Sequence, residues 1–136
     1  MIVARDLPGD WNAGKNRLYI HKLAEPHLRE ALRVCDLYGV IGDIETIGCF
    51  NFRHQRHDPA RPLSYHSFGI AVDINPMFNR PIGQEIGPAP FTEKWMEIWP
   101  EGVSRELVAA FKHAGWSWGG KWKSFIDPMH FELIAR

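Results

Sequence analysis

Two short segments of the chain combine histidines with carboxylates, which are the residue types that bind zinc and transfer protons. The first segment contains His66 and Asp73, and the second, near the C-terminus, contains Asp127 and His130. Two histidines and one carboxylate can bind zinc and leave one coordination position open. A further acid close by can then activate water in that position. A small zinc peptidase is therefore the leading interpretation of the sequence.

The first segment would not indicate a metal site by itself. Residues 70–75 read as a strand whose apolar side chains face a core, while Ala71 and Asp73 face the other way. A histidine seven residues before Asp73 must come from the turn that leads into this strand, and Gly69 allows that turn to fold back. Single histidines and aspartates are nevertheless common as ordinary surface or hydrogen-bonded residues. Taken alone, the segment favours that ordinary interpretation.

The second segment changes this balance. Pro128 disfavours helical backbone at Asp127, so the acid is expected in extended or turn conformation at the start of a strand over residues 129–134. His130 is among the first side chains of that strand, and Glu132 shares its face. Two strands of one sheet that present ligands on the same face would form a three-ligand site. The chain has no His-Glu-x-x-His motif, which excludes the helical class of zinc proteases.

Two helices are expected to support this sheet. The first begins with Pro26 in its first turn and ends at Gly39. The second follows Ser104, a good N-cap, and ends before Gly115. A shorter helix is expected within residues 91–99. The side chains predicted to be buried are Leu28, Leu32, Cys35, Leu37 and Tyr38 in the first helix, and Val103, Leu107, Val108, Phe111 and Ala114 at the second.

The segments between these elements are expected to be strands and loops. Residues 44–53 read as a further strand, and residues 54–62 as a basic, proline-containing loop. Residues 76–90 contain four prolines and two glycines, which predicts a long surface loop. Loops of this length in compact domains often serve as lids or binding rims.

The expected fold class is α+β, with a small antiparallel sheet that carries the zinc site on one face and helices on the other. Residues 1–22 are expected to be irregular, apart from a short extended piece at Leu18 and Ile20. Residues 116–122 read as an aromatic, glycine-rich turn. The chain has the length of one domain, so residues 1–136 are interpreted as a single zinc peptidase domain.

Composition limits the partners and the compartment. Sixteen basic residues balance sixteen acidic residues, so no overall field favours nucleic acid or an anionic membrane. No apolar run approaches the ~20 residues of a membrane span, and no signal peptide is recognisable at the N-terminus. The protein is therefore expected to be made in the cytoplasm, without membrane insertion, and to be a monomer. Cys35 and Cys49 are interpreted as small buried hydrophobes rather than a disulfide or metal ligands.

The two histidine segments together resemble a known family. Ser-x-His-x-x-Gly-x-Ala-x-Asp at residues 64–73, followed by Asp-x-x-His-Phe-Glu at residues 127–132, is similar to the zinc D-Ala-D-Ala carboxypeptidases. That family includes vancomycin-resistance carboxypeptidases and the L-alanyl-D-glutamate endopeptidases of phage endolysins, on a fold shared with hedgehog signalling domains. Residues 48–53 resemble the family's strand that ends in an active-site arginine, and residues 116–120 resemble its glycine-tryptophan turn.

The resemblance implies a role for each matching residue. It makes His66, Asp73 and His130 the ligands of one Zn²⁺ per chain, Asp127 the general base, and Arg53 the group that stabilises the carbonyl oxygen. Such a centre would hydrolyse a peptide bond in the stem peptide of peptidoglycan. With no signal peptide, the enzyme would reach the bacterial cell wall after release or by another export route.

Some residue roles stay open at this stage. Arg56 is an alternative to Arg53 as the cation, and both could be solvated loop charges. Ser64 lacks the surroundings of a nucleophile and is expected to hydrogen-bond the site or the substrate. Glu132 is expected to contact a metal ligand. The remaining histidines have no partner at metal-ligand spacing: His21, His27, His54, His57 and His113.

Three functions remain as alternatives. The dipeptidase branch of the family has Glu at the position of Asp127, so the aspartate favours an L-alanyl-D-glutamate endopeptidase of the phage-lysin type. A D-alanyl-D-alanine carboxypeptidase would use the same zinc centre. A non-catalytic zinc-binding module on this fold is a third possibility, although such a module would be free to lose Asp127 or Arg53. A purely structural zinc site would need a fourth protein ligand, and neither cysteine is near a motif.

Overall fold

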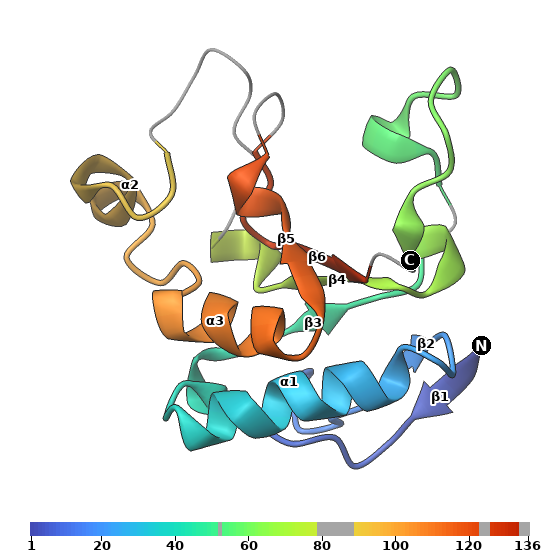
Figure 1. The fold of residues 1–136 in the computed structure, drawn as a ribbon, viewed down its shortest axis with the longest axis horizontal. Coiled ribbons are helices and arrows are strands. Elements are labelled where there is room, and N and C mark those ends of the chain that lie inside the picture. The colour runs from blue at the N-terminus through green and yellow to red at the C-terminus, as the bar shows by residue number, and fades with distance from the viewer. Residues whose placement is uncertain (52, 79–88, 123–125, 134–136) are drawn as a thin grey trace.

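A four-stranded antiparallel sheet lies at the centre of the molecule, in the order β3-β4-β6-β5 (Figure 1). Its strands are β3 (Ile47–Gly48), β4 (Ala71–Ile74), β5 (Trp116–Trp118) and β6 (His130–Leu133). The computed structural model describes residues 1–51, 53–78, 89–122 and 126–133. Helices and small antiparallel sheets make up the described chain, so the predicted α+β class is confirmed.

The pairing register divides the side chains of the sheet between two faces. Asp73 on β4 lies directly opposite His130 on β6, so the two side chains project from the same face. Val72 lies opposite Phe131 and projects from the other face, where both are fully buried. The alternation that predicted a polar face and a core face for these strands is therefore confirmed.

Helix α1 (Glu25–Leu37) begins and ends where the sequence predicted. A proline lies in its first turn, and Gly39 follows it with a left-handed φ of +74°. Three predicted core residues are buried: Leu28, Leu32 and Cys35. Leu37 and Tyr38 are 69% and 50% exposed, so their predicted burial was wrong. Leu37 lies two residues beyond the buried stripe, about 200° around the helix axis, and so faces solvent.

Two further helices precede β5. Helix α2 (Glu93–Ile98) is the short helix expected in this region, and α3 (Arg105–His113) is the longer one. The hydroxyl of Ser104 accepts a hydrogen bond from the Leu107 N–H at 3.1 Å, which confirms the predicted N-cap. The predicted core residues at this helix are all buried: Val103, Leu107, Val108, Phe111 and Ala114. Helices α1 and α3 lie side by side, and their buried residues belong to one core with the apolar face of the sheet (Figure 1).

The N-terminal region is more regular than its sequence predicted. Strands β1 (Ile2–Ala4) and β2 (Leu18–Ile20) pair as an antiparallel two-stranded sheet. A three-residue strand is too short to give a recognisable period, which explains why β1 was missed. Trp11 is fully buried, and the Asn12 side chain bonds both the N–H and the C=O of Ile47, at 2.9 and 3.0 Å. This segment therefore covers the outer edge of β3.

Two predicted segments near the sheet differ in the structure. Strand β3 is shorter than the predicted strand over residues 44–53, because the backbone beyond it bonds the segment before β4: the Asn51 N–H donates to the His66 carbonyl at 3.2 Å. The predicted turn over residues 116–122 begins with strand β5 and becomes a 3₁₀ turn only at Gly119–Lys121. Ser117 separates two buried tryptophans, which is the alternation of a strand.

The remaining predictions agree in part. Strand β4 ends at Ile74, because Asn75 adopts a φ of +46° and its buried side chain accepts hydrogen bonds from the N–H groups of Glu45 and Thr46. Most of the predicted loop over residues 76–90 lies outside the described residues, as does Ile134 of the last predicted strand. Within the described part of the chain, no helix is long and apolar enough to cross a membrane.

Candidate metal centre

Three side chains converge where strands β4 and β6 meet the 3₁₀ turn Tyr65–Phe68. Asp73 and His130 come from the polar face of the sheet, and His66 comes from the turn. The Ser64 hydroxyl caps this turn by accepting a hydrogen bond from the His66 N–H at 3.2 Å. Gly69 ends it with a left-handed φ of +69°. The turn thus folds back toward the strand, as Gly69 was expected to allow.

The donor atoms of these residues form a nearly regular triangle. His66 Nε2 lies 3.1 Å from His130 Nδ1, and Asp73 Oδ1 lies 3.4 Å and 3.5 Å from the same two nitrogens. In a tetrahedral zinc site with bonds of about 2.0–2.1 Å, neighbouring ligand atoms are separated by about 3.3–3.4 Å. The three residues therefore fit a zinc ion in both donor type and spacing.

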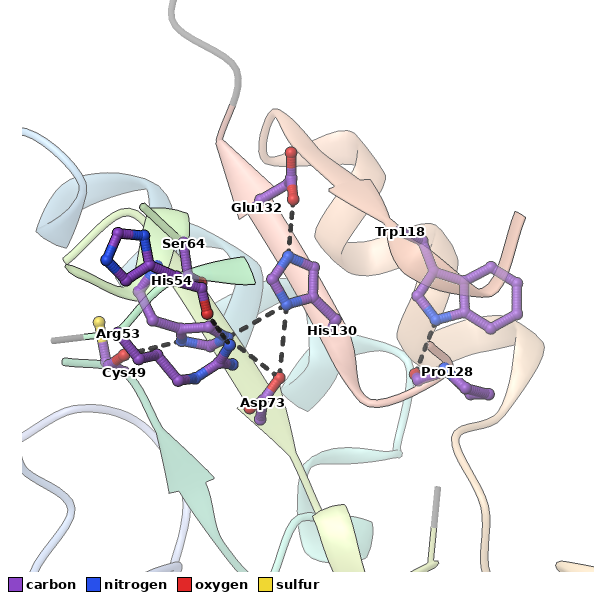
Figure 2. A network of polar contacts seen from close by, with 10 residues as sticks. Cys49, Arg53, His54, Ser64, Asp73, Trp118, Pro128, His130 and Glu132 are labelled. Carbon is purple, nitrogen blue, oxygen red and sulfur yellow. Dashed lines mark hydrogen bonds and ion pairs between the residues drawn. The ribbon is translucent and has the colours of Figure 1, made fainter. Parts of the chain in front are cut away.

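The other ring nitrogen of each histidine contacts an acceptor. His66 Nδ1 lies 2.8 Å from the Cys49 carbonyl oxygen, and His130 Nε2 lies 2.6 Å from Glu132 Oε1 (Figure 2). An acceptor at one nitrogen places the proton there and leaves the lone pair of the other nitrogen toward Asp73. Glu132 thus contacts His130, the histidine with which it shares a strand face. The acceptor for His66 is a backbone carbonyl, which no side-chain motif could reveal.

The electrostatics of the triangle also favour a cation. Asp73 Oδ1 is buried and has no hydrogen-bond partner among the described residues. Burial alone would raise the pKa of Asp73, but contacts with His130 and His66 hold it well below its usual range. Burial lowers the pKa of His130, whereas Asp73 and Glu132 outweigh burial and raise it to about 9. Because the carboxylate stays charged beside two imidazoles, the site attracts either protons or a metal ion.

Asp127 is held beside this triangle by the turn that follows β5. Its backbone N–H donates to the Gly119 carbonyl at 3.0 Å, and its own carbonyl accepts from the His130 N–H at 3.1 Å. A side chain at Gly119 would place its Cβ 2.6 Å from the Asp127 carbonyl oxygen, so only glycine allows this approach. The Trp118 indole N–H donates to the Pro128 carbonyl at 2.8 Å and ties the two segments together (Figure 2). The sequence predicted a glycine-tryptophan turn here, but it did not predict that Gly119 allows the close approach of Asp127.

The carboxyl group of Asp127 has the properties of a base that works near neutral pH. Burial and the negative charge of Asp73 raise its pKa to about 6, although His130, His66 and Arg53 act in the opposite direction. Its Oδ1 is buried without a hydrogen-bond partner among the described residues. A carboxyl group with a pKa close to the working pH can both accept and return a proton.

A pocket of about 350 Å³ opens beside the triangle. The predicted site residues among those that line it are Arg53, Ser64, Asp127, His130 and Glu132, and Arg56 lines it as well. Three lining residues were not considered from the sequence: Gln55, Arg61 and Tyr65. Trp122, from the predicted aromatic turn, lines the pocket as well. The ring of Trp122 lies 5.0 Å from that of His130, between centroids.

Arg53 reaches the pocket from a segment that is bonded to the turn of His66. Its backbone N–H donates to Ser67 Oγ at 2.9 Å, and its carbonyl accepts from the Ser64 N–H at 2.8 Å. Its guanidinium lowers the pKa of Asp127, so its positive charge acts on the proposed base. The position suits a cation that meets negative charge developing beside Asp127.

Among the described residues, neither cysteine thiol and no other histidine is part of the triangle. Cys35 and Cys49 are buried free thiols, and burial raises the pKa of each to about 12. Their interpretation as small buried residues is confirmed. In the described part of the chain, no other histidine joins a cluster that could hold a metal. Two of them contact carbonyl oxygens instead: His27 Nδ1 lies 3.0 Å from that of Ala114, and His54 Nδ1 2.8 Å from that of Arg61.

The C-terminal part of the chain matches the model of a known protein family. A family model described as D-alanyl-D-alanine carboxypeptidase matches residues 57–133, which are 77 of the 136 residues. The matched segment contains the three residues of the triangle together with Asp127 and Glu132. Arg53 lies four residues before the match begins.

Proposed function

We propose a reaction for this chain on the premise that it belongs to the D-alanyl-D-alanine carboxypeptidase family of peptidases. The proposed reaction is zinc-dependent hydrolysis of a peptide bond in the peptidoglycan stem peptide. One observation carries the proposal: three donor atoms lie 3.1–3.5 Å apart beside a buried carboxyl group whose pKa is raised to about 6.

His66, Asp73 and His130 are the proposed zinc ligands. The orphaned Asp73 Oδ1 and the two imidazole lone pairs support this assignment. Zinc bound there would act as a Lewis acid and would lower the pKa of water at the site. Glu132 and the Cys49 carbonyl are proposed to hold the two imidazoles in the tautomers that the ligand set needs.

Asp127 is the proposed general base. With a pKa of about 6 it is mostly ionised at neutral pH, so it can accept the proton of the attacking water. The same carboxyl group can then deliver that proton to the leaving amine. Arg53 is the proposed partner of the negative charge that develops on the carbonyl oxygen, since a guanidinium stays charged at every working pH. Ser64 is proposed to orient the turn of His66 and to contact the substrate from the pocket wall.

The proposed bond is the one between L-alanine and D-glutamate. The reason is the aspartate at position 127, because the dipeptidase branch that the motifs resemble has glutamate there. A D-alanyl-D-alanine carboxypeptidase is the second candidate, and the description of the matching family favours it. Both reactions would use the same ligands, base and cation, so they differ only in how the pocket orients the peptide.

A non-catalytic zinc module is the less favoured alternative. A protein that only binds zinc has no need for a buried base or a guanidinium beside the metal. Asp127 and Arg53 both line the pocket, and Arg53 acts electrostatically on Asp127. We also propose that residues 1–136 act as one peptidase domain, because Trp11 and Ile20 share a single core with Phe131.

Digestion of purified peptidoglycan tests this proposal directly. Mass spectrometry of the products is expected to show new peptides with N-terminal D-glutamate, and none from the Asp127→Asn protein. Release of free D-alanine would instead assign the carboxypeptidase activity and exclude the endopeptidase activity. If the zinc-loaded protein forms neither product, the proposed catalytic function is wrong.

A further inference from the structure

One wall of the pocket is rich in arginine, although the chain has a formal net charge of zero. Arg53, Arg56 and Arg61 all line the pocket and come from one short segment. The acidic lining residues, Asp127 and Glu132, belong instead to the segment that carries His130. Positive and negative charges are therefore segregated between two walls of the pocket. The positive wall carries three arginines, whereas one developing oxyanion needs a single cation.

The loop that carries these arginines, residues 53–63, is bonded to itself. His54 pairs with Leu63 through an isolated antiparallel bridge, and the Gln55 N–H donates to the Pro62 carbonyl at 2.9 Å. His54 Nδ1 also lies 2.8 Å from the Arg61 carbonyl oxygen. We call residues 53–63 the arginine loop. Because its two ends are joined, the loop can hold Arg56 and Arg61 at defined places on the pocket wall.

The arginines of this loop divide into two kinds. Arg53 acts on Asp127 and thus belongs to the reaction centre. Arg61 forms an ion pair with Asp58 at 3.8 Å, in which the two side chains are 43% and 49% exposed. An exposed pair at this distance contributes little, so the Arg61 guanidinium can exchange Asp58 for a stronger partner. Arg56, which lines the same pocket, adds a second guanidinium outside the reaction centre.

We propose that Arg56 and Arg61 recognise a free carboxylate of the peptide outside the bond that is cut, and that the enzyme thereby selects stem peptides with a non-amidated D-glutamate. This inference rests on the proposed function, since γ-linked D-glutamate in the stem peptide carries a free α-carboxylate. Guanidinium groups bind a carboxylate with paired, charge-assisted hydrogen bonds. A carboxamide at the same place replaces one acceptor with an N–H donor and removes the charge, so it would be bound more weakly.

The test measures binding, so that it does not depend on turnover. The zinc-loaded Asp127→Asn protein is titrated calorimetrically with L-Ala-γ-D-Glu-L-Lys-D-Ala, and then with the same peptide carrying the α-carboxamide of D-glutamate. We expect the acid to bind about 10-fold more tightly than the amide. Adding Arg56→Gln and Arg61→Gln together is expected to bring the ratio close to one, and each single change to reduce it. Arg17→Gln removes an equal charge from an exposed position outside the pocket and is expected to leave the ratio unchanged.

The proposal would be overturned if the two peptides bound equally well or if neither bound. It would also be overturned if the double variant kept the full ratio of acid to amide affinity. Thermal melting of each variant separates a lost contact from a lost fold, and the single variants serve if the double variant is unstable. The outcome is independent of catalysis. A wild-type protein that prefers the acid but cuts neither peptide refutes the proposed function alone, whereas one that cuts both equally well refutes only the selection by Arg56 and Arg61.

Discussion

The triangle of donor atoms on the sheet and the arginine loop are built in different ways. Asp73 and His130 lie opposite each other on paired strands, and His130 is almost completely buried. Arg56 and Arg61 lie on the exposed arginine loop, whose ends are joined by the His54–Leu63 bridge and neighbouring hydrogen bonds. The strand register fixes the relative position of the first pair to within the tolerance that a metal needs. The loop can change without disturbing that register, so the proposed metal centre and the proposed selection of a carboxylate can be tested separately.

Loss of a proposed metal ligand on the sheet should have the largest effect. His130→Ala removes one of three donors and leaves the Asp73 charge buried beside a single imidazole. We expect zinc content to fall from about one per chain to nearly none, and hydrolysis to fall by on the order of 10⁴-fold or more. Elemental analysis and a peptide hydrolysis assay measure the two effects. His113→Ala, on the exposed end of α3, is the matched control and should retain both zinc and activity.

Replacement of the proposed base, Asp127, should lower the rate of hydrolysis without affecting metal binding. Asp127→Asn keeps the size of the side chain but cannot accept a proton, so kcat is expected to fall about 10²–10⁴-fold while zinc stays bound. Steady-state kinetics together with zinc analysis give this result. If the Asp127→Asn protein instead lost as much zinc as is expected for His130→Ala, Asp127 would be a fourth ligand.

The contact between Glu132 and His130 should make a smaller contribution. Glu132→Gln removes the charge opposite His130 Nε2, which lies 2.6 Å from the carboxylate. Such outer contacts typically change metal affinity by about 10–100-fold. Competition with a fluorescent zinc chelator measures the dissociation constant. An unchanged constant would mean that strand register alone orients the imidazole.

Much of the site could be predicted from sequence, and the reason is its local spacing. Period-two alternation placed Asp73 and His130 each on the polar face of its own strand. The family resemblance, and not the alternation, joined these two residues with His66 and Asp127 in one site. Interactions across the fold could not be predicted in this way. Examples are the Cys49 carbonyl that contacts His66 and the short strand β1 that pairs with β2. Leu37 shows a different error, because an apolar residue on the wrong side of a helix was read as part of the core.

Gly119 tests how closely the turn that holds Asp127 is packed. The Cβ added by Gly119→Ala would meet the Asp127 carbonyl oxygen at 2.6 Å and the Cβ of His130 at 3.2 Å. Overpacking of this kind typically costs about 1–3 kcal/mol in the free energy of unfolding. Gly42→Ala is the control, since its Cβ would meet nothing within 4 Å. Urea denaturation of both variants should show a loss for the first that the second lacks.

The pH dependence of hydrolysis should show the smallest effect. It links the arginine loop to Asp127, because Arg53 lowers the pKa of Asp127. The pKa of Asp127 is raised to about 6, so protonation below that pH blocks the base and kcat/KM should fall on the acid side. Bound zinc adds positive charge and moves this limb to about 6 or below. Arg53→Gln removes a charge that lowers the pKa of Asp127, so the limb should move to higher pH. A pH–rate profile whose acid limb stays in place in Arg53→Gln would disconnect Arg53 from the base.

The most direct test of the central claim is zinc stoichiometry in the chelated and reconstituted wild-type protein, followed together with peptide hydrolysis. If His66, Asp73 and His130 form the metal centre, the protein binds about one zinc per chain, loses hydrolysis on chelation and regains it in proportion to the zinc restored. Hydrolysis that persists in the metal-free protein, or zinc binding that survives when all three residues are replaced, would contradict the account.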